Sequence, residues 1–225
     1  MKNEWHTLEP SKNFNLKRVP QMVSEEEMRF LINFFKTHPH LHNGITPWNK
    51  PYQKDEIDGY ARMSIKHVQN EEFNRIIKRI EVQAGQHIFA EFGVHCYPER
   101  TQMNAWSPLK LQHPHDDAYT GNDTALDPEG YRNKKPHRFY TCMTYLNDGY
   151  EGGELYFPPQ PKCLAGLDIK PVAGESVIFQ GIDQLHGVRK TRRDYRWTIA
   201  TWFTVAEEKM TLHNKLHADD DSFET

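Results

Sequence analysis

The chain has 225 residues, a formal net charge of −3 and three cysteines. A chain of this length buries enough apolar surface to fold without covalent staples, and its slightly acidic balance argues against nucleic acid or an anionic membrane as a partner. The widely spaced cysteines indicate a reducing compartment rather than a disulfide framework or a zinc site. No apolar run reaches the length of a membrane span, and the polar first residues lack the apolar core of a signal peptide. We therefore expect a cytoplasmic protein.

The first third of the chain is expected to be helical. Ser24 and Glu27 have the spacing of a capping box and precede apolar residues at helical spacing. A second segment with one apolar stripe begins after Asn70, and Gly93 is expected to end it. Residues 44–60, between the two helices, are rich in Pro, Asn, Lys and Asp and predict a long loop.

From about residue 95 the pattern changes to short strands. The expected strands or strand-containing segments are Arg138–Leu146, Gly152–Pro158, Ile169–Val172, Ser176–Gln180 and Trp197–Thr204. Helices first and antiparallel strands later predict an α+β fold, with a jelly-roll core and supporting N-terminal helices. We divide the chain, within a single structural domain, into residues 1–94 (helical support and substrate loop), 95–210 (core) and 211–225 (an acidic tail).

A pattern of metal ligands lies early in the core segment. His115 and Asp117 are two residues apart, and on a strand such residues point to the same side. His186 follows much later, at the end of a strand-like run. Two histidines and one carboxylate occupy one face of an octahedral metal and leave three positions open, as in non-haem Fe(II) oxygenases. The pattern alone is weak evidence, because a chain with thirteen histidines matches it easily by chance.

Three neighbouring residues compete for these roles. His113 would share a face with His115, but the intervening Pro114 and the match to His-x-Asp favour His115. Asp116 is expected to point to the opposite side of the strand and to support the site or face solvent. His137 begins a strand and is expected at a loop end.

Arg196 opens an alternating strand in which Thr198, Ala200 and Trp202 share its face. A buried arginine on an inward face needs an anion, and the far carboxylate of 2-oxoglutarate is a suitable bidentate partner. The small side chains of Thr198 and Ala200 would leave room beside it. A protein carboxylate or solvent would also satisfy an arginine, so the cosubstrate is favoured only together with the metal ligands.

Taken in order, several segments resemble the prolyl 4-hydroxylase family of Fe(II)- and 2-oxoglutarate-dependent dioxygenases. The similarity runs from about Phe73 to Phe203, and Tyr-Leu-Asn followed by Gly-Gly-Glu and Phe-Pro is especially characteristic. The segments that carry it are His115–Asp117, Arg138–Asn147, Gly152–Pro158, Pro171–Phe179, Leu185–Val188 and Arg196–Trp202.

The resemblance implies a double-stranded β-helix core with iron at one mouth, and with it the cofactor Fe(II), the cosubstrates 2-oxoglutarate and dioxygen, and support by ascorbate. His115, Asp117 and His186 would be the catalytic metal ligands. The residues that the resemblance places around 2-oxoglutarate are Arg196, Tyr145, Leu155 and Trp202. Met143 shares a face with Tyr145, and we expect it to pack in the core rather than to line the pocket.

The same resemblance implies hydroxylation of an unactivated C–H bond, with a prolyl residue of a peptide or protein as the first choice of substrate. Arg196 stands where the collagen-modifying branch usually has lysine, and Trp106 where many relatives have tyrosine. These departures leave open a hydroxylase of a free amino acid or another small metabolite. Asp117 disfavours a halogenase, which needs Gly or Ala at that position.

A third alternative is a catalytically silent jelly roll that binds a ligand or partner. Nucleic-acid demethylation is disfavoured by the acidic balance. The polar loops at residues 44–60 and 119–136 are expected to close over the substrate. No feature of the sequence indicates an oligomeric state.

Overall fold

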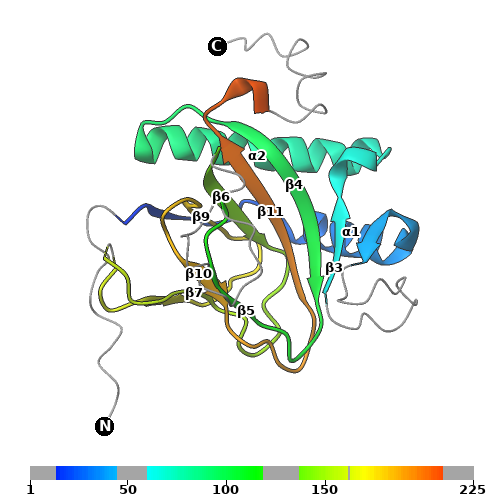
Figure 1. Cartoon of the computed structure of the whole chain (residues 1–225). Coiled ribbons are helices and arrows are strands. Elements are labelled where there is room, and N and C mark those ends of the chain that lie inside the picture. The colour runs from blue at the N-terminus through cyan, green and yellow to red at the C-terminus, as the bar shows by residue number, and fades with distance from the viewer. Residues whose placement is uncertain (1–13, 45–59, 119–136, 162, 210–225) are drawn as a thin grey trace.

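The computed structural model describes residues 14–44, 60–118, 137–161 and 163–209. Two antiparallel β-sheets face each other, and helices cover the outer face of the larger sheet (Figure 1). The fold is therefore α+β with a jelly-roll core and supporting helices, which confirms the prediction from the sequence. Both predicted loops and the acidic tail fall almost entirely outside the described residues.

The larger sheet has seven strands within the described part of the chain. Their order is β1 (Leu16–Val19), β9 (Ser176–Gln180), β6 (Arg138–Tyr145), β11 (Arg196–Thr204), β4 (Tyr97–Trp106), β3 (Tyr60–Ser64) and β2 (His42–Gly44). The smaller sheet has the order β5 (Gln112–His115), β10 (His186–Val188), β7 (Leu155–Phe157) and β8 (Leu167–Ile169).

Both predicted helices are confirmed. In α1 (Glu25–Thr37) the Ser24 hydroxyl accepts from the Glu27 amide while the Glu27 carboxylate accepts from the Ser24 amide, which completes the capping box. In α2 (Glu71–Phe92) the Asn70 side chain accepts from a first-turn amide. Gly93 ends α2 in the left-handed conformation at φ 69°. Short 3₁₀ turns lie at Pro39–Leu41, Ile65–His67 and Glu207–Lys209.

The first third of the chain was expected to contain two helices and a loop, and it also contains three strands that the sequence did not predict. Strands β1, β2 and β3 come from that part of the chain and join the larger sheet, where β1 pairs with β9 and β3 pairs with β4. Each of the three has at most five residues, too short a run for alternation to show clearly beside long helical stripes. The N-terminal region therefore completes the core sheet as well as supporting it.

Two apolar clusters hold the layers together. One lies between the helices and the larger sheet and includes Phe35, Phe73 and Phe203. The other lies between the two sheets and includes Phe157 and Phe179, whose rings pack edge to face at 5.4 Å. Strand β11 contributes Ile199 and Phe203 to the first cluster from one face, so its other face is left for the space between the sheets.

None of the described helices combines the length and the apolar character that a membrane span requires.

Candidate metal and cosubstrate site

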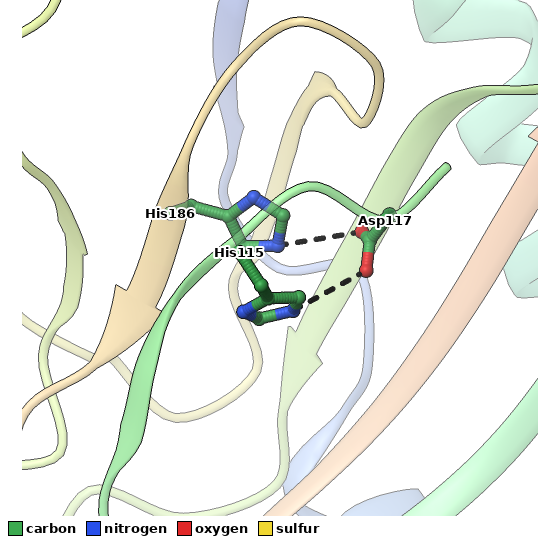
Figure 2. A group of neighbouring side chains, drawn as sticks. All are labelled: His115, Asp117 and His186. Carbon is green, nitrogen blue, oxygen red and sulfur yellow. Dashed lines mark ion pairs between the residues drawn. The ribbon is translucent and has the colours of Figure 1, made fainter. Parts of the chain in front are cut away.

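The three predicted metal ligands meet between the two sheets. His115 ends β5, His186 begins β10, and the two residues are direct cross-strand partners. Their Nε2 atoms lie 3.5 Å and 3.4 Å from the two carboxylate oxygens of Asp117 (Figure 2). One ligand atom from each residue lies within 4.8 Å of the other two. A single ion can therefore bind all three side chains.

Backbone carbonyls fix the orientation of both imidazole rings. His115 Nδ1 donates to the His113 carbonyl and His186 Nδ1 donates to the Gln184 carbonyl, each at 3.0 Å. A carbonyl can only accept, so the proton of each neutral ring sits on Nδ1, and Nε2 keeps its lone pair. This is the arrangement that a metal-binding histidine requires.

Asp117 reaches the site from a turn, because β5 ends at His115. The expectation that one strand aims His115 and Asp117 together is therefore wrong. The Asp117 amide instead donates to the Gly181 carbonyl at 2.9 Å, and the Thr141 hydroxyl donates to Asp117 Oδ2 at 2.5 Å. A Cβ on Gly181 would lie 2.8 Å from the Thr141 hydroxyl oxygen, so glycine is required at this contact.

The Asp117 carboxylate is buried but ionised. Burial alone would raise its pKa, whereas the nearby His186 and His115 rings, whenever they are protonated, counter this by their charge and hydrogen bonds and hold the pKa well below its usual range. A carboxylate that keeps its charge in the protein interior is suited to bind a cation.

The competing residues do not reach the ion site with their side chains. His113 is exposed and contributes only its carbonyl. Asp116 accepts from the backbone amides of Ala118 and Asp183, so it connects the Asp117 turn to the loop before β10. His137 lies just before β6, with its Nε2 3.7 Å from a Glu99 carboxylate oxygen.

Gln112 is a site residue that the sequence did not indicate. Its side-chain amide donates to His115 Nε2 at 3.0 Å, the nitrogen that also faces Asp117. A metal ion can bind His115 Nε2 only after the hydrogen bond from Gln112 to this nitrogen is broken. No motif marks a lone glutamine, so only the cross-strand position of Gln112 opposite Val188 reveals it.

Arg196 is fully buried and begins β11, whereas Trp202, six residues further along that strand, pairs with Thr141, the residue that donates to Asp117. Arg196 therefore lies at the other end of the space between the sheets. Its Nε donates to the Gly153 carbonyl at 3.2 Å, while Nη2 has no hydrogen-bond partner in the described part of the chain. The guanidinium carbon lies 5.3 Å from the Tyr145 ring centroid and 5.7 Å from that of Trp106. Neither aromatic ring supplies the anion that a buried guanidinium needs.

One cavity contains both the metal ligands and Arg196. The residues that line it are Gln102, Asn104, Trp106, Gln112, His115, Asp117, Thr141, Met143, Leu155, His186, Val188, Arg196, Thr198, Ala200 and Trp202. Alternate residues of β11, from Arg196 to Trp202, thus face the cavity. Leu155 and Trp202 lie on the wall. Met143 packs against the second apolar cluster, as expected, but it also lines the cavity, which was not expected.

Tyr145 is fully buried beside Arg196. Its hydroxyl has no hydrogen-bond partner in the described residues, and the same holds for the Thr198 hydroxyl and the Trp202 indole nitrogen. Burial raises the pKa of Tyr145, against the effect of the Arg196 charge. A guanidinium with two hydroxyls on adjacent strands fits the distal carboxylate of 2-oxoglutarate, since each group can donate to its oxygens.

Residues 92–204 match the family model of the 2OG-Fe(II) oxygenase superfamily. The match spans the whole cavity and half of the chain, and the chain belongs to this superfamily.

Among curated proteins, the chain is similar to prolyl 3-hydroxylase 2 of Rattus norvegicus, with 35% identity over 101 residues. This alignment covers 42% of the chain and 14% of the relative, so the chain corresponds to a small part of that protein.

Two solved structures illustrate the shared fold. The viral collagen prolyl hydroxylase of Paramecium Bursaria Chlorella virus-1, in complex with 2OG, aligns with a TM-score of 0.59 and 18% identity over 88% of this chain and 99% of that one. A prolyl hydroxylase from Trichoplax adhaerens, in complex with a hypoxia inducible factor peptide, aligns with a TM-score of 0.61 and 15% identity over 88% and 86%.

Proposed function

We propose that the protein is an Fe(II)- and 2-oxoglutarate-dependent dioxygenase that hydroxylates an unactivated C–H bond. One observation carries the proposal: a single cavity has a two-histidine, one-carboxylate cluster at one end and, at the other, a fully buried arginine with no anion among the described residues. The first feature suits iron with three open positions. The second suits a cosubstrate that presents a carboxylate.

His115, Asp117 and His186 would hold the iron, and Arg196 would bind the distal carboxylate of 2-oxoglutarate. When bound, iron with 2-oxoglutarate and dioxygen supplies the oxidant that inserts oxygen into the substrate C–H bond. The protein orients both imidazole rings through their Nδ1 atoms, keeps Asp117 charged and buries the Arg196 guanidinium away from water. These tasks are binding, orientation and exclusion of solvent.

For the substrate we propose a prolyl residue in a peptide or protein. The support is the similarity to proteins named prolyl 3-hydroxylase and collagen prolyl hydroxylase, and the peptide bound to the Trichoplax adhaerens structure. The sequence motifs resemble prolyl 4-hydroxylases, whereas the curated relatives are prolyl 3-hydroxylases. The ring carbon that receives the hydroxyl group is therefore part of the test.

The test incubates the purified chain with Fe(II), 2-oxoglutarate, dioxygen and ascorbate, together with proline-rich peptides or free L-proline. Succinate formation and the mass of each substrate are measured, and hydrolysis followed by amino-acid analysis separates 3- from 4-hydroxyproline. Omission of ascorbate shows whether it supports turnover. The Asp168→Asn variant, altered at an exposed carboxylate that pairs with Arg189, serves as a control.

A gain of one oxygen on peptidyl proline supports the full proposal. Oxidation of free amino acids alone replaces the peptide substrate with a small metabolite. Failure to form succinate with any substrate, in a preparation that binds iron, contradicts the dioxygenase assignment and favours the silent binding protein.

A further inference from the structure

The turn between β6 and β7 places a second tyrosine beside Arg196. Tyr150 is only 7% exposed although it lies in a connection, and its hydroxyl has no hydrogen-bond partner in the described part of the chain. A buried hydroxyl without a partner destabilises the folded protein, because its lost hydration is not replaced. Such a group in a folded protein calls for an explanation.

Gly153 lies against both Tyr150 and Arg196. The Gly153 carbonyl accepts the Arg196 Nε–H at 3.2 Å. A Cβ on Gly153 would lie 2.7 Å from the nearest carbon of the Tyr150 ring and 3.2 Å from Arg196 Cδ. Gly153 also has φ 69°, which favours glycine. The glycine thus lets the ring and the arginine stem pack against the same backbone position.

The Arg196 charge acts on the Tyr150 hydroxyl. Burial raises the Tyr150 pKa above its usual range, and the guanidinium is the largest influence that counters this rise. Arg196 Nη2 has two hydrogens and no partner in the described residues. One of these hydrogens is available to a ligand carboxylate while the other remains for a phenol oxygen, which can accept.

We propose that Tyr150 is a positioning residue of the cosubstrate site: when the distal carboxylate of 2-oxoglutarate binds, the Tyr150 hydroxyl accepts from Arg196 Nη2, a bond that neither atom makes in this structure, and so orients the guanidinium toward the carboxylate. The Gly153 carbonyl restrains the Nε side of the same group. The guanidinium is then held by a carbonyl and a phenol, neither of which neutralises its charge. Arg196 keeps its full attraction for an anion. This inference rests on the proposed function, because it requires that 2-oxoglutarate binds at Arg196.

The matched variants are Tyr150→Phe and Tyr140→Phe. Both remove one hydroxyl from a buried tyrosine, but Tyr140 stacks on Phe92 in the cluster between helices and sheet, away from the cavity. The ring that packs against Gly153 is retained in Tyr150→Phe, so the fold should persist, and thermal denaturation verifies it.

The experiment measures binding by calorimetry to the Mn(II)-loaded protein without turnover. The probes are 2-oxoglutarate, N-oxalylglycine and 2-oxobutyrate, which lacks the distal carboxylate. Tyr150→Phe should weaken binding of both dicarboxylates roughly tenfold and leave 2-oxobutyrate unchanged, while Tyr140→Phe changes none of the three. In turnover, the KM for 2-oxoglutarate should rise while kcat stays near the unaltered value.

If Tyr150→Phe binds both dicarboxylates with dissociation constants within twofold of those of the unaltered protein, the role of Tyr150 is overturned and the proposed function is left intact. Equal weakening of 2-oxobutyrate also overturns it, because the hydroxyl would then act on the metal end of the ligand. If the unaltered protein binds metal but none of the dicarboxylates, both the inference and the proposed function fail.

Discussion

The two ends of the cavity are built on opposite principles. At the metal end the protein itself supplies partners: two carbonyls orient the histidines, and Thr141 and Gly181 hold Asp117. At the Arg196 end, the Nη2 group and the neighbouring tyrosine and threonine hydroxyls are buried without partners in the described residues. One end is assembled before any ligand arrives, whereas the other is completed by its ligand.

This difference has an energetic meaning. A metal site gains affinity when its ligands are oriented in advance. A carboxylate site gains affinity when buried donors have no better partner, because the ligand then relieves their desolvation cost of about 1–3 kcal/mol each. The apo protein carries this cost at the Arg196 end, and binding of a dicarboxylate should remove it.

The largest effect is expected from the loss of a metal ligand. Asp117→Ala removes the only carboxylate of the cluster and should abolish turnover, with metal affinity reduced by more than the roughly 10- to 100-fold that loss of a supporting residue costs. Metal titration by calorimetry measures this loss, with Asp168→Ala as the control at an exposed carboxylate. Near-native metal affinity in Asp117→Ala would show that the ligand assignment is wrong.

The next largest effect is expected from the loss of the Arg196 charge at the opposite end of the cavity. Arg196→Leu should weaken 2-oxoglutarate binding by roughly 2–5 kcal/mol, since the ligand carboxylate would be buried unpaired, and should leave metal affinity unchanged. Arg189→Leu, at an exposed arginine paired with Asp168, is the matched control. An unchanged 2-oxoglutarate dissociation constant in Arg196→Leu would exclude Arg196 as the carboxylate partner.

A smaller change probes the support of the metal end. Thr141→Val removes the donor to Asp117 Oδ2 and leaves a buried carboxylate oxygen without it. Metal affinity should fall about 10- to 100-fold, and the free energy of unfolding of the apo protein should fall by about 1–3 kcal/mol. Metal titration and chemical denaturation measure the two losses, and an unaltered metal affinity would show that Thr141 does not orient Asp117.

The smallest effect is expected from the same Thr→Val substitution at Thr198, near Arg196. Thr198 is as buried as Thr141, but its hydroxyl has no partner in the described residues. Thr198→Val removes a buried hydroxyl whose desolvation is not compensated, so it should not lower the free energy of unfolding of the apo protein and should raise it by about 1 kcal/mol. A loss as large as that of Thr141→Val, measured by the same denaturation, would mean that both ends are satisfied without ligand.

Local patterns predicted the helices and much of the cavity correctly. The capping box of Ser24 and Glu27 and the stop at Gly93 depend on neighbouring residues, which the sequence displays directly. The alternation along β11 separates the cavity face of Arg196 from the core face of Ile199 in the same way.

Features that depend on distant contacts were missed or misjudged. Asp117 is aimed by Gly181 and Thr141, which lie in other segments, so a strand rule applied to His115 and Asp117 gave the wrong local structure. Gln112 donates to His115 Nε2, and Tyr150 and Arg196 both lie against Gly153, through folding that no spacing reveals. The short strands of the N-terminal region likewise form because a partner strand exists.

Strand β5 lies at the edge of the smaller sheet, with β10 as its one neighbouring strand in the described structure. Pro114 within it lacks a backbone donor, which further limits its pairing. An ion that joins His115 to His186 therefore acts as a cross-link between this edge strand and its neighbour. Local opening of β5 would then release the ion in the same step. The free energy needed to open β5 would therefore grow with metal concentration. Amide exchange in β5 would then serve as a gauge of metal occupancy, independent of catalysis.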